Sequence, residues 1–218
     1  MSLEFVEHPA KGEHKATVIW LHGLGDSGEG FLPVASQLAL PEELGVRFIF
    51  PHAPVQPVTI NGGMAMRSWY DIKSMDLDKR ADETGVRESA AKVEQLIKQE
   101  LENGIAADKI ILAGFSQGGV ISLHLAPRLP QKLAGVMALS TYMCVPEKLT
   151  EEARQTGLTV FMAHGRHDDV VPHRAGRNAF DVLSAHNMDV SWQDYSMAHQ
   201  VCGEELMAIR QWLIARLN

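Results

Sequence analysis

Short apolar runs alternate along this chain with longer stretches in which apolar residues recur every three or four positions. Most of the short runs are almost continuously apolar, which is typical of strands that are buried on both faces of a parallel sheet. They predict strands at residues 16–21, 46–50, 109–113, 133–139, 158–163 and 190–195. The longer stretches predict helices at residues 31–40, 83–103, 120–125, 174–186 and 204–217.

The clearest predicted helix covers residues 83–103. Its apolar residues share one face at intervals of three or four positions: Val86, Ala90, Val93, Ile97 and Leu101. Asn103 and Gly104 provide its end, because both residue types are frequent just after a helix. Strands that alternate with helices in this way predict an α/β fold with a mostly parallel central sheet and helices on both faces.

The turn between one predicted strand and the next helix carries the sequence Gly114-Phe115-Ser116-Gln117-Gly118. Gly-x-Ser-x-Gly in this context is typical of a nucleophile elbow, a sharp turn that lifts the serine hydroxyl above the sheet edge. The strained turn requires small neighbours, which the glycines provide. The Gln117 N–H would then point at an oxygen that becomes negative during attack. A chance match in a loop is the alternative interpretation.

A serine hydroxyl is a weak nucleophile at neutral pH, so the elbow predicts a base and an acid that orients the base. Hydrolases of this topology carry them in the chain order serine, acid, histidine. Asp168 and Asp169 follow the end of a predicted strand, and His199 lies in the loop after the last predicted strand. The residues therefore predict a triad of Ser116, Asp168 and His199, with Asp169 as the competing acid.

Several segments match one known family in the same order along the chain. They are LHGLGDSG at 21–28, PHAP at 51–54, RSWYD at 67–71, GFSQGG at 114–119, HGRHD at 164–168, and finally His199. With these matches, nearly the whole chain resembles the bacterial carboxylesterases and the acyl-protein thioesterases and lysophospholipases grouped with them. This resemblance implies the α/β-hydrolase fold.

The resemblance also implies a role for each matching residue. Ser116 would be the nucleophile, His199 the base and Asp168 the orienting acid, because the family pattern His-Gly-x-x-Asp selects Asp168 over its acidic neighbour. The backbone N–H groups of Leu24 and Gln117 would form the oxyanion hole. The chain departs slightly from the family at position 196, where a serine stands in place of the usual glycine.

The activity that the resemblance implies is that of a serine carboxylesterase. Such an enzyme hydrolyses carboxylic esters of short to medium acyl chains through an acyl-enzyme and needs no cofactor. An acyl-protein thioesterase or a lysophospholipase is the alternative, since all of these substrates present a carbonyl to the same groups. The expected partners are small or lipid-like acyl esters and, in the alternative, acylated proteins.

Residues 53–80 interrupt the alternation of strands and helices. Prolines and glycines punctuate the first half, but many apolar side chains argue against disorder, and a loop this long is usually functional. We expect this segment and the loop at 141–145 to form an acyl groove, with Trp69 as its main wall. The expected substrate-binding residues are Ile60, Met66, Trp69, Met75 and Val145. Alternatively, the apolar side chains of this segment form a satellite core, a small separate hydrophobic cluster beneath the loop, or a homodimer contact.

Composition narrows the remaining possibilities. A chain of 218 residues suits a single domain, 1–218. A net charge of −7 without a basic cluster argues against binding to nucleic acid. No apolar run approaches the ~18 residues of a transmembrane helix, and residues 1–8 lack the features of a signal peptide. We therefore expect a cytoplasmic enzyme without integral membrane association, whose Cys144 and Cys202 are free thiols.

Other classes of protein fit less well. The Gly-x-Gly-x-x-Gly spacing at 23–28 superficially suits a nucleotide-binding oxidoreductase, but no acidic residue closes the next predicted strand. The histidines and aspartates at 164–169 do not have the spacing of a metallo-hydrolase site, so we expect no metal. We expect His22 and His164 to support loops through hydrogen bonds. An inactive binding protein remains as a third alternative.

Overall fold

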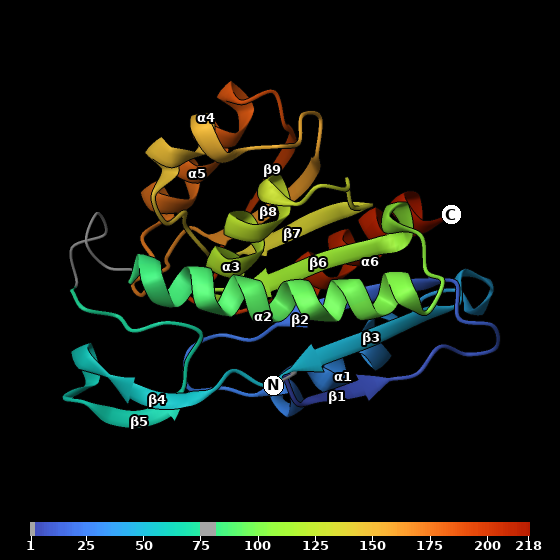
Figure 1. The fold of residues 1–218 in the computed structure, drawn as a ribbon, viewed down its shortest axis with the longest axis horizontal. Helices are drawn as coiled ribbons and strands as arrows, with labels where there is room; N and C mark the ends of the chain where they lie inside the picture. The colour runs from blue at the N-terminus through green and yellow to red at the C-terminus, as the bar shows by residue number, and fades with distance from the viewer. Residues whose placement is uncertain (1–2, 75–81) are drawn as a thin grey trace.

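The computed structural model describes residues 3–74 and 82–218 (Figure 1). Its centre is a seven-stranded sheet in the order β1-β3-β2-β6-β7-β8-β9. β1 runs antiparallel to β3 and the other neighbouring strands are parallel, which confirms the predicted mostly parallel sheet. The strands are β1 (Phe5–His8), β2 (Ala16–Leu21), β3 (Val46–Pro51), β6 (Ile110–Phe115), β7 (Gly135–Leu139), β8 (Thr159–Gly165) and β9 (Asp189–Tyr195).

Helices cover both faces of the sheet, as predicted. In Figure 1, α2 and α3 cross the face turned toward the viewer, and α1 and α6 lie behind the sheet. The helices are α1 (Gly28–Leu38), α2 (Glu83–Glu102), α3 (Gln117–Leu125), α4 (Leu149–Glu152), α5 (His173–Ala185) and α6 (Gly203–Leu217). Short 3-10 turns are η1 (Glu42–Leu44), η2 (Thr59–Asn61), η4 (Ala107–Lys109), η5 (Ala126–Arg128) and η6 (Pro146–Lys148).

The side chains of each central strand divide between two apolar cores. From β2, Ile19 and Leu21 enter the core beneath α2, α3 and α5, whereas Val18 and Trp20 enter the core above α1 and α6. All four side chains are fully buried, and burial of a side chain of this size contributes about 1.5–3 kcal/mol. Packing from both sides thus fixes the sheet, whose carboxyl edge carries the loops described below.

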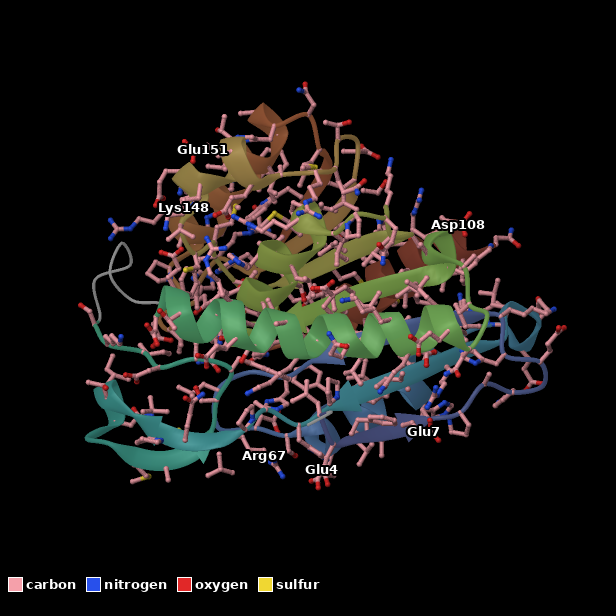
Figure 2. The ribbon with its side chains drawn as sticks, viewed as in Figure 1. Glu4, Glu7, Arg67, Asp108, Lys148 and Glu151 are labelled. Carbon is pink, nitrogen blue, oxygen red and sulfur yellow. The ribbon has the colours of Figure 1, made fainter. Side chains whose placement is uncertain are left out.

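Charged side chains lie around the outside of these layers. Figure 2 shows Glu4, Glu7 and Asp108 along the rim of the molecule and Glu151 near α4, and all four are exposed. Within residues 3–74 and 82–218, no helix is long and apolar enough to cross a membrane.

Residues 53–80 contain a hairpin where the sequence indicated a loop. β4 (Val55–Val58) and β5 (Met64–Arg67) form a separate antiparallel pair. The turn between them contains Gly62 and Gly63, whose φ angles of 67° and 79° suit glycine. The sequence did not reveal the hairpin because Pro57 interrupts the first strand and the residues of the two strands, VQPV and MAMR, do not alternate regularly between apolar and polar.

The structure adds one strand to those predicted. β1 was not predicted, because it is a short edge strand whose residues are all exposed or half-buried. Met75, an expected groove residue, lies outside the described residues.

Candidate active site

Ser116 occupies the sharp turn between β6 and α3, with φ 53° and ψ −117°. A non-glycine residue with positive φ is strained, and such strain concentrates at functional sites. The Ser116 N–H donates to Leu139 O at 2.8 Å. Ser116 O accepts from the Gly119 N–H at 3.0 Å and from the Thr141 hydroxyl at 2.7 Å. The end of β7 and the loop after it therefore hold the turn in its strained conformation.

Backbone contacts explain the glycines on either side of the serine. A Cβ on Gly114 would lie 2.3 Å from the carbonyl group of Gly118, and a Cβ on Gly118 would lie 2.4 Å from Leu21 O. Both distances are shorter than real Cβ contacts, and the opposing atoms are backbone atoms that cannot rotate away. Close packing of β2 and α3 against the turn thus requires glycine at both positions.

The three residues predicted as a triad meet above the sheet edge. His199 Nδ1 lies 2.7 Å from Asp168 Oδ2, and His199 Nε2 lies 2.9 Å from Ser116 Oγ. A carboxylate can only accept a hydrogen bond, so Nδ1 carries the proton and Nε2 accepts from the serine hydroxyl. This is the tautomer that a general base opposite the serine requires.

Asp168 is held as a charged group. Its Oδ1 accepts the N–H groups of Val170 at 3.0 Å and Val171 at 2.8 Å. Burial opposes ionisation, but hydrogen bonds from His164, His199 and the Val171 amide outweigh it, so the pKa of the Asp168 carboxyl is far below its usual range. Asp168 is therefore ionised throughout the neutral range, as an acid that orients a histidine must be.

The two other acidic residues near the site, Asp169 and Asp194, have different surroundings. Asp169 is exposed, as expected for a solvated residue. Asp194 on β9 accepts from Arg166 Nε at 2.6 Å and from Trp192 Nε1 at 3.2 Å. Asp168 is thus the acid that contacts His199.

His22 orients the peptide group that carries the Leu24 N–H. Its Nε2 accepts the Ala53 N–H at 3.0 Å, so its Nδ1 carries the proton and donates to Gly23 O at 2.7 Å. In a trans peptide the Gly23 C=O and the Leu24 N–H point in opposite directions. Burial lowers the pKa of His22 and keeps the ring neutral. The predicted loop-supporting role of His22 is confirmed by these hydrogen bonds.

The loop after β2 is also tied to the hairpin. Arg67, the last residue of β5, accepts the Gly25 N–H at 2.8 Å through its backbone oxygen. Its guanidinium donates to Ala53 O at 3.0 Å, and Figure 2 shows this side chain at the lower rim of the molecule, between the hairpin and Glu4. The hairpin and the loop that carries Leu24 therefore share one hydrogen-bonded junction.

Gln117 contributes more than the backbone N–H that was predicted for it. Its side-chain oxygen accepts the Trp69 N–H at 2.8 Å, and its side-chain nitrogen donates to Tyr70 O at 2.6 Å and to Ser68 Oγ at 3.0 Å. As the first residue of α3, it has a backbone N–H without an intrahelical acceptor. One residue thus joins the elbow to residues 68–70, a link that no local pattern indicated.

A cavity of about 280 Å³ opens beside Ser116. Its walls are mostly apolar and come from residues that the sequence did not single out individually: Tyr70, Ile72, Tyr142, Val170 and Val171. Leu24, Gln117 and His199 line it as well. A cavity with such walls suits an apolar chain. The carbonyl group at the end of that chain would lie between Ser116 and the backbone N–H groups of Leu24 and Gln117.

The prediction of Trp69 as a wall of this cavity is wrong. Only 1% of its surface is exposed, and its indole N–H donates to His22 O at 2.9 Å. Its ring packs against the His22 ring with centroids 5.3 Å apart. The neighbouring Tyr70 takes the wall position, so the satellite-core alternative describes Trp69 better.

The other expected groove residues that the structure describes are not among those that line the cavity. Ile60, Met66 and Val145 are partly buried against the core under α2 and α3. The expected segments do contribute to the cavity, through Tyr70 and Ile72 from residues 53–80 and through Tyr142 from residues 141–145.

Histidine, cysteine and acidic side chains outside the proposed triad are arranged differently from it. Within the described residues, no group of three or more histidine, cysteine or acidic side chains could hold a metal ion. Cys202 is half-buried with its sulfur 3.9 Å from Glu204 Oε2, and it lies at the start of α6 rather than at an elbow.

Comparison with known proteins supplies the family. A sequence model of the family described as Phospholipase/Carboxylesterase matches residues 1–216. The protein belongs to this family.

Several relatives are similar to this member of the family over most of their length. Acyl-protein thioesterase 1 of Neurospora crassa is 40% identical over 220 residues, which cover 96% of this chain and 90% of the relative. The crystal structure of Zea mays acyl-protein thioesterase 2 has a TM-score of 0.88 and 29% identity, with 99% of each chain covered. Arabidopsis thaliana SOBER1 has a TM-score of 0.88 and 30% identity, covering 94% of this chain and 100% of that one. The protein is therefore a hydrolase with the α/β-hydrolase fold.

Proposed function

We propose that this protein hydrolyses acyl thioesters on proteins, with Ser116 as nucleophile, His199 as base and Asp168 as orienting acid. The observation that carries the proposal is the continuous chain of contacts from Asp168 through His199 to Ser116, at 2.7 Å and 2.9 Å, beside an apolar cavity. The similarity to proteins named acyl-protein thioesterase favours a thioester over an oxyester.

The first half of the reaction forms an acyl-enzyme. Ser116 Oγ attacks the thioester carbonyl carbon while His199 Nε2 takes the hydroxyl proton, and Asp168 stabilises the resulting imidazolium. The N–H groups of Leu24 and Gln117 donate to the oxygen that becomes negative. One such donor is worth roughly 3–4 kcal/mol of transition-state stabilisation in a comparable site. The imidazolium then protonates the departing sulfur, which leaves as a thiol.

The second half repeats these steps with water. His199 takes a proton from a water molecule, the resulting hydroxide attacks the acyl-serine carbonyl, and the proton returns to Ser116 Oγ. The products are the carboxylic acid and the free enzyme. Every proton in this cycle passes through His199, so no cofactor is required.

A carboxylesterase acting on short to medium acyl chains is the second candidate. The family's description as Phospholipase/Carboxylesterase supports it, and so does a cavity of about 280 Å³, which is near the lower limit of ordinary ligand sites. An oxyester would react through the same steps, with an alcohol as the leaving group.

A matched series of substrates separates the two candidates. For each acyl length from acetyl to palmitoyl, kcat/KM is measured for a cysteine-peptide thioester and for the oxyester of the corresponding serine peptide. Preference for the long thioesters supports the thioesterase, and preference for short oxyesters supports the carboxylesterase. Ser116→Ala should remove turnover and labelling by a fluorophosphonate probe while the melting temperature stays near that of the wild type. Turnover that survives Ser116→Ala would refute the whole mechanism.

A further inference from the structure

A second buried histidine lies directly behind the proposed triad acid. His164, in β8, is 1% exposed. Its Nε2 lies 2.8 Å from Val171 O and 3.4 Å from Asp168 Oδ2. The same Oδ2 atom contacts His199 Nδ1 at 2.7 Å. Because a carbonyl oxygen only accepts, His164 Nε2 carries a proton and directs it toward Val171 O and the Asp168 carboxylate.

The His164 ring is fixed by its neighbours. It stacks on Trp192 of β9, with ring centroids 6.0 Å apart and planes 16° from parallel. The Trp192 N–H donates to Asp194 Oδ2 at 3.2 Å. The guanidinium of Arg177 lies over the Trp192 ring, 4.8 Å from its centre. His173 meets the His164 ring edge-on at 5.7 Å. Together with the hydrogen bond to Val171 O, these contacts hold Nε2 on the side of the ring that faces Asp168.

Gly176 closes the remaining side of the ring. A Cβ built on this α5 residue would lie 2.4 Å from His164 Nδ1 and 3.0 Å from Trp192 Cη2. A glycine therefore allows α5 to pack against the histidine, and the backbone of α5 covers Nδ1. Through Gly176, the helix α5 contacts a neighbour of the proposed triad, although α5 contributes none of the three proposed catalytic side chains.

We propose that His164 is a positioning residue, which holds the Asp168 carboxylate in the plane and rotation that His199 needs. This inference rests on the proposed function of the triad. Backbone N–H groups hold Asp168 Oδ1, as described above, so the two imidazoles share Oδ2. Without the His164 donor, Oδ2 is held by His199 alone, and the carboxylate can turn together with the base that it should fix. A misplacement of about 1 Å at such a site reduces turnover by roughly 10²-fold.

A matched pair of substitutions tests the donor itself. His164→Gln places an N–H donor near the position of Nε2, whereas His164→Met has similar length and no donor. We expect His164→Met to lower kcat by roughly 10- to 100-fold with KM changed by less than about threefold, and His164→Gln to recover most of the loss. Equal losses in the two variants, with folded protein in both, would refute the role of the donor.

The pH profile of kcat/KM provides a readout that a simple packing defect would not move. The acid limb reports protonation of the general base in the free enzyme, and a carboxylate oriented toward a base in general favours the protonated form of that base. In His164→Met the acid limb should therefore shift to lower pH, and His164→Gln should return it toward the wild-type position. A packing defect would only reduce the concentration of active enzyme, which active-site titration with a fluorophosphonate measures. An unshifted acid limb in His164→Met would overturn the proposal.

A remote substitution tests the same idea from α5. Gly176→Ala forces a methyl group against His164 Nδ1, so it should lower kcat by roughly tenfold or more. Gly203→Ala, at the start of α6, is the matched control because nothing lies within 4 Å of its added Cβ. In a His164→Ala background, where the ring is absent, Gly176→Ala should cause no further loss. Full activity of folded Gly176→Ala would contradict the proposal.

The outcomes also separate this inference from the proposed function. Loss of turnover in Ser116→Ala together with wild-type activity in His164→Met would leave the triad standing and refute the role of His164. Turnover that persists in Ser116→Ala would remove the basis of both.

Discussion

Replacing Glu205 with glutamine should stabilise the protein, and the gain should grow as the pH rises. Glu205 lies in the first turn of α6 and is fully buried. Within the described part of the chain, neither of its carboxyl oxygens has a hydrogen-bond partner. Burial raises the pKa of Glu205 to about 8 from an ordinary value of 4.5. The Cys202 backbone acts in the opposite direction and does not reverse the shift.

The size of the effect follows from proton linkage. Between pH 4.5 and pH 8 the folded protein keeps a proton on Glu205 that the unfolded chain loses, so the free energy of unfolding falls as pH rises through this window. The accumulated penalty is about 1 kcal/mol at pH 5, about 3 kcal/mol at pH 7 and about 4–5 kcal/mol above the folded pKa. Below pH 4.5 both states are protonated and the penalty vanishes.

Glutamine has nearly the same shape and no ionisation, so the difference between variant and wild type isolates the carboxylate. Urea unfolding at pH 5, 7 and 9 measures it directly, and a gain of about 3 kcal/mol at pH 7 corresponds to a rise in Tm of roughly 6–12 °C. Glu204→Gln is the control, because Glu204 is exposed one position away. A stability difference that is the same at all three pH values would refute the reasoning, since only a titrating group makes the difference depend on pH.

Three further substitutions test the residues that hold the elbow and the loop after β2 in place. His22→Phe keeps the ring but loses the hydrogen bond to Gly23 O, and we expect kcat to fall by roughly 10- to 100-fold with little change in KM, measured by steady-state kinetics. Gly118→Ala brings a Cβ within 2.4 Å of Leu21 O, so soluble protein should melt at a lower temperature and fail to react with a fluorophosphonate. Gln117→Leu leaves the buried Trp69 N–H without its acceptor and removes one of the donors to the Tyr70 carbonyl, which keeps the Ser68 hydroxyl, and urea unfolding should show a loss of about 1–3 kcal/mol. Wild-type behaviour in any of these variants would contradict the role given to that residue.

The sheet was predictable because its strands are buried on both faces. A strand such as β2, in which each residue enters one of two cores, appears in the sequence as an unbroken apolar run. The order of serine, acid and histidine along the chain then placed Ser116, Asp168 and His199 at one edge of the sheet, and the structure brings them within hydrogen-bond distance.

The cavity walls were less predictable, for a physical reason. Residues 53–80 lack a regular period, so the sequence does not tell which of two adjacent aromatic residues faces the cavity. The Gln117 side chain decides this by binding the backbone at Trp69 and Tyr70, 48 and 47 positions away in the chain. The stacking of His164 on Trp192 depends likewise on a glycine in α5. Contacts between distant segments of this kind leave no local pattern.

The hairpin and residues 68–72 form an insertion after β3 that has hydrogen bonds of its own. The insertion closes on itself through the Gly63 N–H to Val58 O at 3.0 Å, the Ile60 N–H to Ile72 O at 3.0 Å and the Ser68 N–H to Pro54 O at 2.9 Å. It takes no part in the pairing of the seven-stranded sheet. A change in its length therefore does not shift the register of any strand that carries the proposed triad, and long insertions between fixed ends add little entropic cost. The tip of the hairpin can thus vary in length without moving the triad, whereas residues 67–70 are constrained by their hydrogen bonds to Gly25 and Gln117.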